Sequence, residues 1–191
     1  MLFIYFEFDF QLVEDALETA ILSRKLGKSK EVIEGKFDRA LRFCEKVNNR
    51  SQLIRVHYQR AWTYIHYFDD YQNFLTEFEQ VKTLVSSESS ISEVELYFNL
   101  FNVLKGVVIS DIFKGQGAID LTKERTDINI VIQSHENNKN KPSSALIAKT
   151  FRVILELWDR IASKDDPDDL FDELSEYFKE SVGHIEYPFD M

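Results

Sequence analysis

The chain has 191 residues, and its 33 acidic side chains outnumber the 23 basic ones, for a net charge of −10. This acidity argues against nucleic acid as the main ligand, because binding to phosphates relies on clustered Lys and Arg. The single Cys44 excludes an internal disulfide, no apolar run is long enough to span a bilayer, and residues 1–10 lack the features of a signal peptide. We therefore expect a cytoplasmic protein with no membrane partner.

The first 26 residues contain two competing patterns. Residues 6–10 alternate Phe with acidic residues, as a half-buried strand would. However, Phe6, Phe10, Val13 and Leu17 also keep the spacing of one helix face, and no second alternating segment exists to pair with a strand. We therefore expect a helix over residues 2–26.

The rest of the chain also reads as helix, since it has only 6 Gly and 3 Pro but 16 Phe and 8 Tyr. Ser51 and either Asp69 or Asp70 are the expected N-caps of two helices, and Ser92 with Glu95 has the spacing of a capping box. The apolar spacing predicts these helices at about 30–48, 52–68, 71–86, 91–113, 118–135, 143–161 and 165–182. Together with the first one, they make eight helices, or four pairs.

An internal repeat supports this pairing. The apolar positions Phe37, Ala40, Cys44 and Val47 recur after 34 residues as Tyr71, Phe74, Phe78 and Val81. Between them, Tyr58, Ala61, Trp62 and Ile65 form a second helical stripe, which predicts that Trp62 lies in the core. A period of 34 residues built from two helices is the tetratricopeptide length, and residues 55–84 resemble one such repeat. Trp62 and Phe74 depart from the small residues that this family usually has at their positions.

The resemblance implies an all-α fold in which antiparallel helix pairs stack as a short, right-handed superhelix of about eight helices. We expect a single helical-repeat domain over residues 1–191, most similar to tetratricopeptide proteins in residues 30–86 and degenerate in helices 91–182. An unrelated helical bundle is the alternative fold. The helix at 91–113 is apolar nearly all round, which predicts that it is buried.

The resemblance also implies a function, because tetratricopeptide folds bind peptides or partner proteins along a concave groove. Projected onto this sequence, the groove would present Val56, Gln59, Thr63 and His66. Asn99 and Asn102 could continue it, since amides both donate and accept hydrogen bonds, although a solvated edge explains them equally well. We expect a non-enzymatic adaptor or regulator that needs no cofactor.

Sites for metals and catalysis are weakly indicated. Asp165, Asp169 and Glu176 have the spacing of a calcium loop, but Leu170 replaces the required Gly, and the histidines show no zinc-binding pattern. One alternative function remains open. Arg50 with His57, and Arg60 with His66, resemble the loose Arg-x(4–6)-His motif of HEPN ribonucleases, in which both residues would act on the RNA phosphate.

Charge is unevenly distributed along the chain. Residues 24–60 hold eleven Lys and Arg against four acids, a net +7, whereas residues 159–191 hold eleven acids against three bases, a net −8. Solvated helix faces would explain this pattern. The alternative is a homo-oligomer in which the basic and acidic segments of neighbouring copies attract each other.

Overall fold

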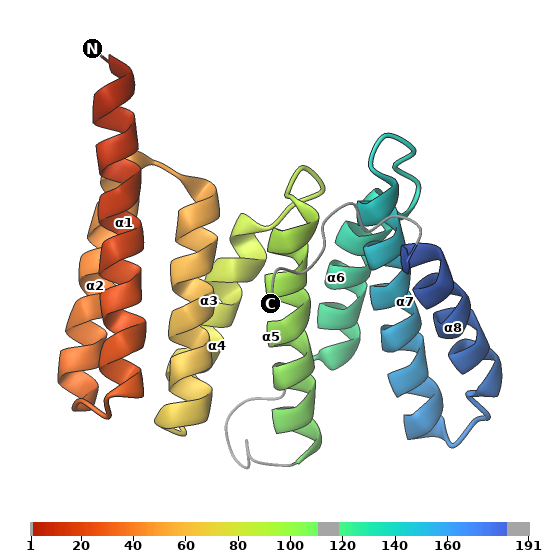
Figure 1. The fold of residues 1–191 in the computed structure, drawn as a ribbon. Coiled ribbons are helices and arrows are strands. Elements are labelled where there is room, and N and C mark those ends of the chain that lie inside the picture. Colours follow the sequence, from red (N-terminus) through yellow and green to blue (C-terminus); the bar gives the residue numbers. More distant parts are fainter. Residues whose placement is uncertain (1, 111–118, 183–191) are drawn as a thin grey trace. The chain divides into compact units, whose positions relative to one another are not determined.

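The computed structural model describes residues 2–110 and 119–182, with side chains from residue 10 onward, and its regular structure is helical (Figure 1). Helix accounts for 84% of the described residues, and no strand occurs among them, which confirms the all-α class and the helical start of the chain. The eight helices of this part are α1 (Leu2–Lys25), α2 (Lys30–Val47), α3 (Arg50–Tyr67), α4 (Tyr71–Leu84), α5 (Ile91–Ile109), α6 (Leu121–Glu136), α7 (Pro142–Ser163) and α8 (Asp168–Val182).

Local signals set where the helices begin and end. Asp70 caps α4 as expected, because its side chain accepts a 3.1 Å hydrogen bond from the Asn73 backbone N–H. The cap of α3 is Asn49, which accepts from Gln52 N at 3.2 Å, so the expectation of Ser51 is wrong by two residues. At the end of α1, Gly27 has φ +63°, a conformation in which most other residues would be strained.

The capping box of α5 also lies two residues earlier than expected. The Ser90 backbone N–H donates to Glu93 Oε2 at 2.6 Å, and the Glu93 backbone N–H donates to Ser90 Oγ at 3.3 Å. The sequence contains two overlapping Ser-x-x-Glu patterns, Ser90 with Glu93 and Ser92 with Glu95. The first one is used, since the chain turns into the helix before Ile91.

The chain forms two compact units. The N-terminal unit comprises Met1–Ser86 and Glu95–Ile119, and the C-terminal unit comprises Ser87–Val94 and Asp120–Met191. Within the N-terminal unit, α1 packs on α2, α3 packs on α4, and α3 also contacts both α1 and α2. No helix in the described part of the chain is long and apolar enough to cross a membrane.

The repeated stripes form much of the N-terminal core. The side chains of Phe37, Ala40, Cys44, Phe74, Phe78 and Val81 are all at most 1% exposed, and α1 adds Val13, Leu17 and Ala20. The Phe78 ring lies 5.7 Å from the ring of Tyr97 on α5. Tyr97, Leu100, Phe101 and Leu104 are buried, which agrees with the expectation for this helix.

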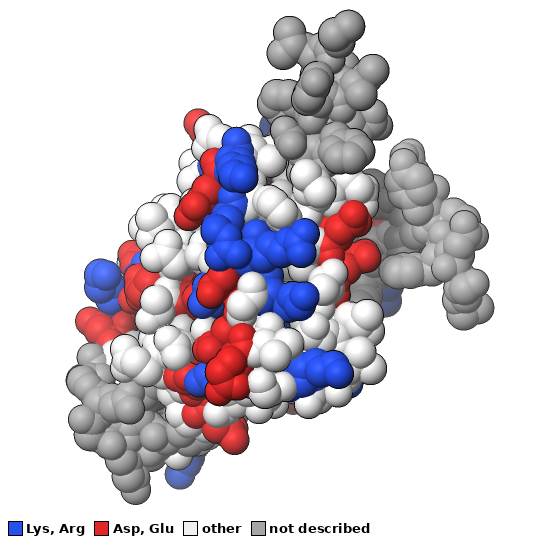
Figure 2. All heavy atoms as spheres, turned by 90° about the vertical axis from the view of Figure 1, so that its left-hand side faces the viewer, with Lys and Arg blue, Asp and Glu red and all other residues white. Residues whose placement is uncertain are grey.

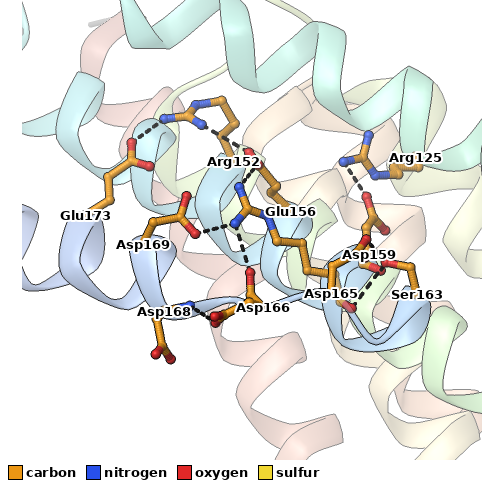
Figure 3. Close-up of polar contacts among 11 residues, drawn as sticks. Arg125, Arg152, Glu156, Asp159, Ser163, Asp165, Asp166, Asp168, Asp169 and Glu173 are labelled. Carbon is orange, nitrogen blue, oxygen red and sulfur yellow. Dashed lines mark hydrogen bonds and ion pairs between the residues drawn. The ribbon is translucent and has the colours of Figure 1, made fainter.

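In the C-terminal unit, α7 packs on α6 and on α8. Ile128, Ile132, Val153, Leu155 and Leu170 are buried between these helices. Two ion pairs hold α8: Arg152 pairs with Glu173 at 2.6 Å (Figure 3), and Arg160 pairs with Asp169. Arg125 on α6 reaches Asp159 on α7 at 2.5 Å, so the α6–α7 contact and the α7–α8 contact each include an ion pair.

Candidate partner-binding surface

The residues expected to line a groove on α3 have different environments. Val56 and Thr63 are only 0% and 2% exposed, so their side chains are closed to a partner in this structure. Gln59 is half-buried and His66 is exposed. The difference arises because α3 is packed on several sides, against α1, α2 and α4.

A cationic contact from α1 occupies the face of α3 that carries Gln59 and Thr63. Arg24 Nη1 donates a 2.8 Å hydrogen bond to Thr63 Oγ1 and longer ones, of 3.4 Å, to the backbone oxygen and Oε1 of Gln59. The Arg24 guanidinium also lies 4.9 Å from the centroid of the Tyr67 ring. Gln59 and Thr63 therefore hold an arginine of the same chain.

The charge of this arginine is not balanced locally. Arg24 is 8% exposed, and its Nε is buried without a hydrogen-bond partner. No carboxylate among the described residues pairs with it, and burial lowers its pKa. Burial and the charge of Arg24 also lower the pKa of His66, so a positive potential extends to the exposed part of α3.

Beside Arg24, α3 leaves one row of rings partly open. Tyr58, Trp62 and His66 follow at intervals of four residues, and we call them the α3 strip. The Tyr58 and Trp62 ring centroids are 6.1 Å apart, and those of Trp62 and His66 are 4.1 Å apart. Tyr58 and Trp62 are half-buried and His66 is exposed. Packing therefore holds the first two rings in place, while part of the surface of all three rings is accessible. Trp62 is therefore not the core residue that the apolar stripe predicts.

The amides of α5 adjoin this strip. Burial raises the pKa of Tyr58, while a hydrogen bond between Tyr58 and Asn99 opposes that increase. Asn99 is thus placed at the strip by contact with Tyr58. Asn102 is partly buried, and its Oδ1 has no hydrogen-bond partner among the described residues. An amide oxygen without a hydrogen-bond donor can accept a hydrogen bond from a ligand.

The Arg and His residues of the ribonuclease-like spacing have separate environments. His57 Nδ1 lies 2.6 Å from Glu77 Oε2, and Arg60 Nε lies 3.3 Å from Glu77 Oε1. Glu77 is 6% exposed, so this cluster joins α3 to α4 inside the unit. Burial opposes the charge of Arg60, but the attraction of Glu77 is among the contacts that outweigh it and raise its pKa.

The other two residues of these motifs lie apart from that cluster. The His66 ring packs against Trp62 at a tilt of 46°, and Arg50 contacts Ser86 Oγ at 3.5 Å. Cys44 offers no alternative nucleophile, because burial raises the pKa of its thiol to about 11. No group of three or more His, Cys, Asp or Glu side chains in the described part of the chain is arranged to hold a metal ion.

Arg24, Tyr58 and Trp62 were not expected from the sequence to be parts of a surface. The available signal was the interval of four between Tyr58, Trp62 and His66, which places three rings on one side of a helix. No comparable signal pointed to Arg24, since its partners are 35 and 39 residues away. Comparisons of the chain with protein-family models, with curated proteins and with solved structures found no match.

Proposed function

We propose that the N-terminal unit is a tetratricopeptide-like adaptor or regulator module that binds a peptide, or a segment of another protein, across α1, α3 and α5. The observation that carries this proposal is the buried, uncompensated Arg24 beside the half-open α3 strip. A cation in this position is costly for the isolated protein. A ligand that brings a negative group would offset that cost.

The chemistry of the surface supports this kind of ligand. Aromatic side chains with little freedom to move are typical anchors of protein interfaces. Asn99 and Asn102 supply amides, which suit the alternating donors and acceptors of a peptide backbone. Because Arg24 and His66 contribute a positive potential, we expect the bound segment to contain Asp, Glu or a C-terminal carboxylate.

Selection from a random peptide library on the full chain tests the proposal. We expect enrichment of peptides that contain acidic and apolar residues. The affinities of the selected peptides are then measured by fluorescence polarisation for the wild type, Trp62→Ala and Arg24→Met. Each substitution should weaken binding by at least about tenfold.

Ile130→Ala is the matched control for loss of exposed apolar surface, because Ile130 is 61% exposed on α6 in the other unit. This variant should bind the selected peptides as the wild type does. The proposal is wrong if no peptide is enriched, or if the selected peptides bind Trp62→Ala and Arg24→Met as tightly as the wild type.

The ribonuclease alternative has less support. Catalysis at an RNA phosphate needs the Arg and His side chains to converge on one reacting group. Here, His57 and Arg60 share the buried Glu77, while His66 lies against Trp62. A mutation-sensitive cleavage of RNA by the purified chain would nevertheless favour that alternative.

A second proposal concerns self-association. We propose that the basic segment 24–60 of one copy attracts the acidic segment 159–191 of another copy. Opposite net charges of +7 and −8 support it.

We also propose that the protein is cytoplasmic. This proposal is supported by its single cysteine, because proteins of oxidising compartments often contain disulfides, which need two.

A further inference from the structure

The outer face of the α1–α2 pair contains a groove whose α2 wall is apolar and basic and whose α1 wall is apolar apart from Thr19 and Asp15. One depression, of about 120 Å³, is lined by Leu12, Asp15, Ala16 and Thr19 of α1 and by Lys36 and Arg39 of α2, so it holds two cations and one carboxylate. The next, of about 110 Å³, is lined by Leu12 of α1 and by Phe43, Lys46 and Val47 of α2. Leu12 borders both, so the two depressions adjoin each other, and we call them together the α1–α2 groove.

The basic side of this groove is a single stripe of α2. Lys36, Arg39, Phe43 and Lys46 recur at intervals of three or four residues and therefore share one helix face. Arg39 and Lys46 lie 5.3 Å and 5.9 Å from the Phe43 ring centroid. No described carboxylate forms an ion pair with Lys36, Arg39 or Lys46. Figure 2 shows Lys and Arg side chains gathered in the middle of this side of the molecule, with Asp and Glu side chains around them.

Apolar surface extends the groove on both helices. Leu22 and Leu26 of α1 are 55% and 63% exposed, and Val32 of α2 is 45% exposed. In stacked helical repeats, the outermost pair usually presents a polar outer face, since no neighbour covers it. An exposed apolar face with unpaired cations is therefore suited to an amphipathic partner that carries negative charge.

The helix α8 has that composition. Phe171 and Phe178 are 50% and 68% exposed, and their separation of seven residues places them on the same side of α8. Asp169 and Glu173 are used within the unit, by Arg160 and Arg152. Asp168, Asp172 and Glu176 have exposed side chains that form no ion pair with any described residue, and in Figure 3 the Asp168 carboxylate points away from Arg152.

We propose that α8 of one copy docks in the α1–α2 groove of a second copy, with Phe171 and Phe178 as its two anchors. The spacing supports this match. With a rise of about 1.5 Å per residue, the two Phe residues are about 10.5 Å apart along α8. On α2, Lys36 and Arg39 line one depression, and Phe43, Lys46 and Val47 line the other. The midpoints of these two groups are seven to eight residues apart, which is about 11 Å at the same rise per residue.

Charge and geometry then act together in this contact. The carboxylates of Asp168, Asp172 and Glu176 would meet Lys36, Arg39 and Lys46, while the rings cover the apolar floor. The contact joins two different surfaces, so a pair of copies still has one unused groove and one unused α8, and association continues to a ring or an open chain. This inference rests on the self-association proposed above and names the surfaces that produce it.

A mixing experiment tests the inference. The groove variant is Lys36→Glu with Arg39→Glu, and the helix variant is Phe171→Ala with Phe178→Ala. Sedimentation velocity at 0.1 M salt should show concentration-dependent association of the wild type and at least about 30-fold weaker association of each variant alone. An equimolar mixture should form a heterodimer and nothing larger, because only one intact groove and one intact α8 can meet.

Two control variants test whether any change in net charge, or any loss of exposed apolar surface, weakens association. Lys123→Glu with Lys139→Glu makes the same change in net charge outside the groove, and Ile130→Ala removes exposed apolar surface outside α8. Both should associate as the wild type does. Raising the salt to 1 M should weaken association of the wild type, since the screening length falls from about 10 Å to about 3 Å. Circular dichroism confirms that each variant remains helical.

The possible failures are distinguishable. A wild type that stays monomeric at every concentration would contradict the self-association itself and, with it, this inference. A wild type that associates while the groove and helix variants do so equally well would contradict the α8 contact alone. Larger species in the equimolar mixture would also contradict it, because they require a second interface.

Discussion

Arg24 at the end of α1 donates a 2.8 Å hydrogen bond from Nη1 to Thr63 Oγ1 near the end of α3. This bond, and the ring of Tyr67, hold a guanidinium that no described carboxylate neutralises. Burial lowers the pKa of Arg24, which means that the fold disfavours its charge. The stability of the fold alone therefore does not explain why an arginine occupies this position.

The first prediction concerns Arg24→Met. Met fills a similar volume without a charge, so the free energy of unfolding should stay unchanged or rise by about 1 kcal/mol. Urea denaturation followed by circular dichroism measures this change. A loss of more than about 2 kcal/mol would show that the bonds to Thr63 and Gln59 outweigh the cost of burying the cation.

The second prediction compares two large side chains of the N-terminal unit. Phe78 is 1% exposed, so Phe78→Ala should lower the free energy of unfolding by about 3–5 kcal/mol. Trp62 is half-buried, so Trp62→Ala should cost only about 1–2 kcal/mol. Denaturant titration of both variants provides the comparison. Equal costs would mean that Trp62 belongs to the core and not to an open surface.

The third prediction concerns the cluster around Glu77. Glu77→Ala removes the carboxylate that His57 and Arg60 share and leaves a half-buried guanidinium with fewer partners. We expect a loss of about 3 kcal/mol in the free energy of unfolding. His57→Ala should likewise lower the melting temperature. If instead His57→Ala abolished an RNA-cleaving activity and left the melting temperature unchanged, a catalytic role would replace the structural one.

The fourth prediction concerns pH. His135 is 7% exposed, its Nε2 has no hydrogen-bond partner in the described part of the chain, and burial and then Lys141 lower its pKa. Below its usual value of 6.5, the unfolded chain therefore binds a proton that the folded chain does not. The free energy of unfolding is therefore not reduced by His135 above pH 6.5, and it declines as the pH falls from there towards the lowered pKa.

Melting temperatures measured near pH 7.5 and near pH 5.5 check this expectation. The decrease at low pH should be smaller for His135→Gln than for the wild type. It should not vanish, because the pKa of His66 is lowered as well and acts in the same direction. An identical decrease in both proteins would show that His135 does not contribute to the pH dependence.

Much of the helical framework could be predicted from the sequence. The 34-residue repeat predicted six core positions, and five of them are buried. These are Phe37, Ala40, Cys44, Phe74 and Phe78, whereas Tyr71 is half-buried. Helix starts were less certain, since Ser51 and Ser92 are both good caps by type but lie inside α3 and α5. Caps depend on the backbone conformation just before the first turn, and residue type alone does not determine that conformation.

The sequence by itself determined the helices, the core stripes of α2 and α4, and the separation of charge between residues 24–60 and 159–191. Only the tertiary structure decided which side of α3 is open. A helical period shows which side chains share a face, but α3 has neighbours in α1, α2 and α4, and their positions close the faces of Val56 and Thr63. The burial of Arg24 without a carboxylate was decided in the same way, because Gln59 and Thr63 meet it only after α1 packs on α3.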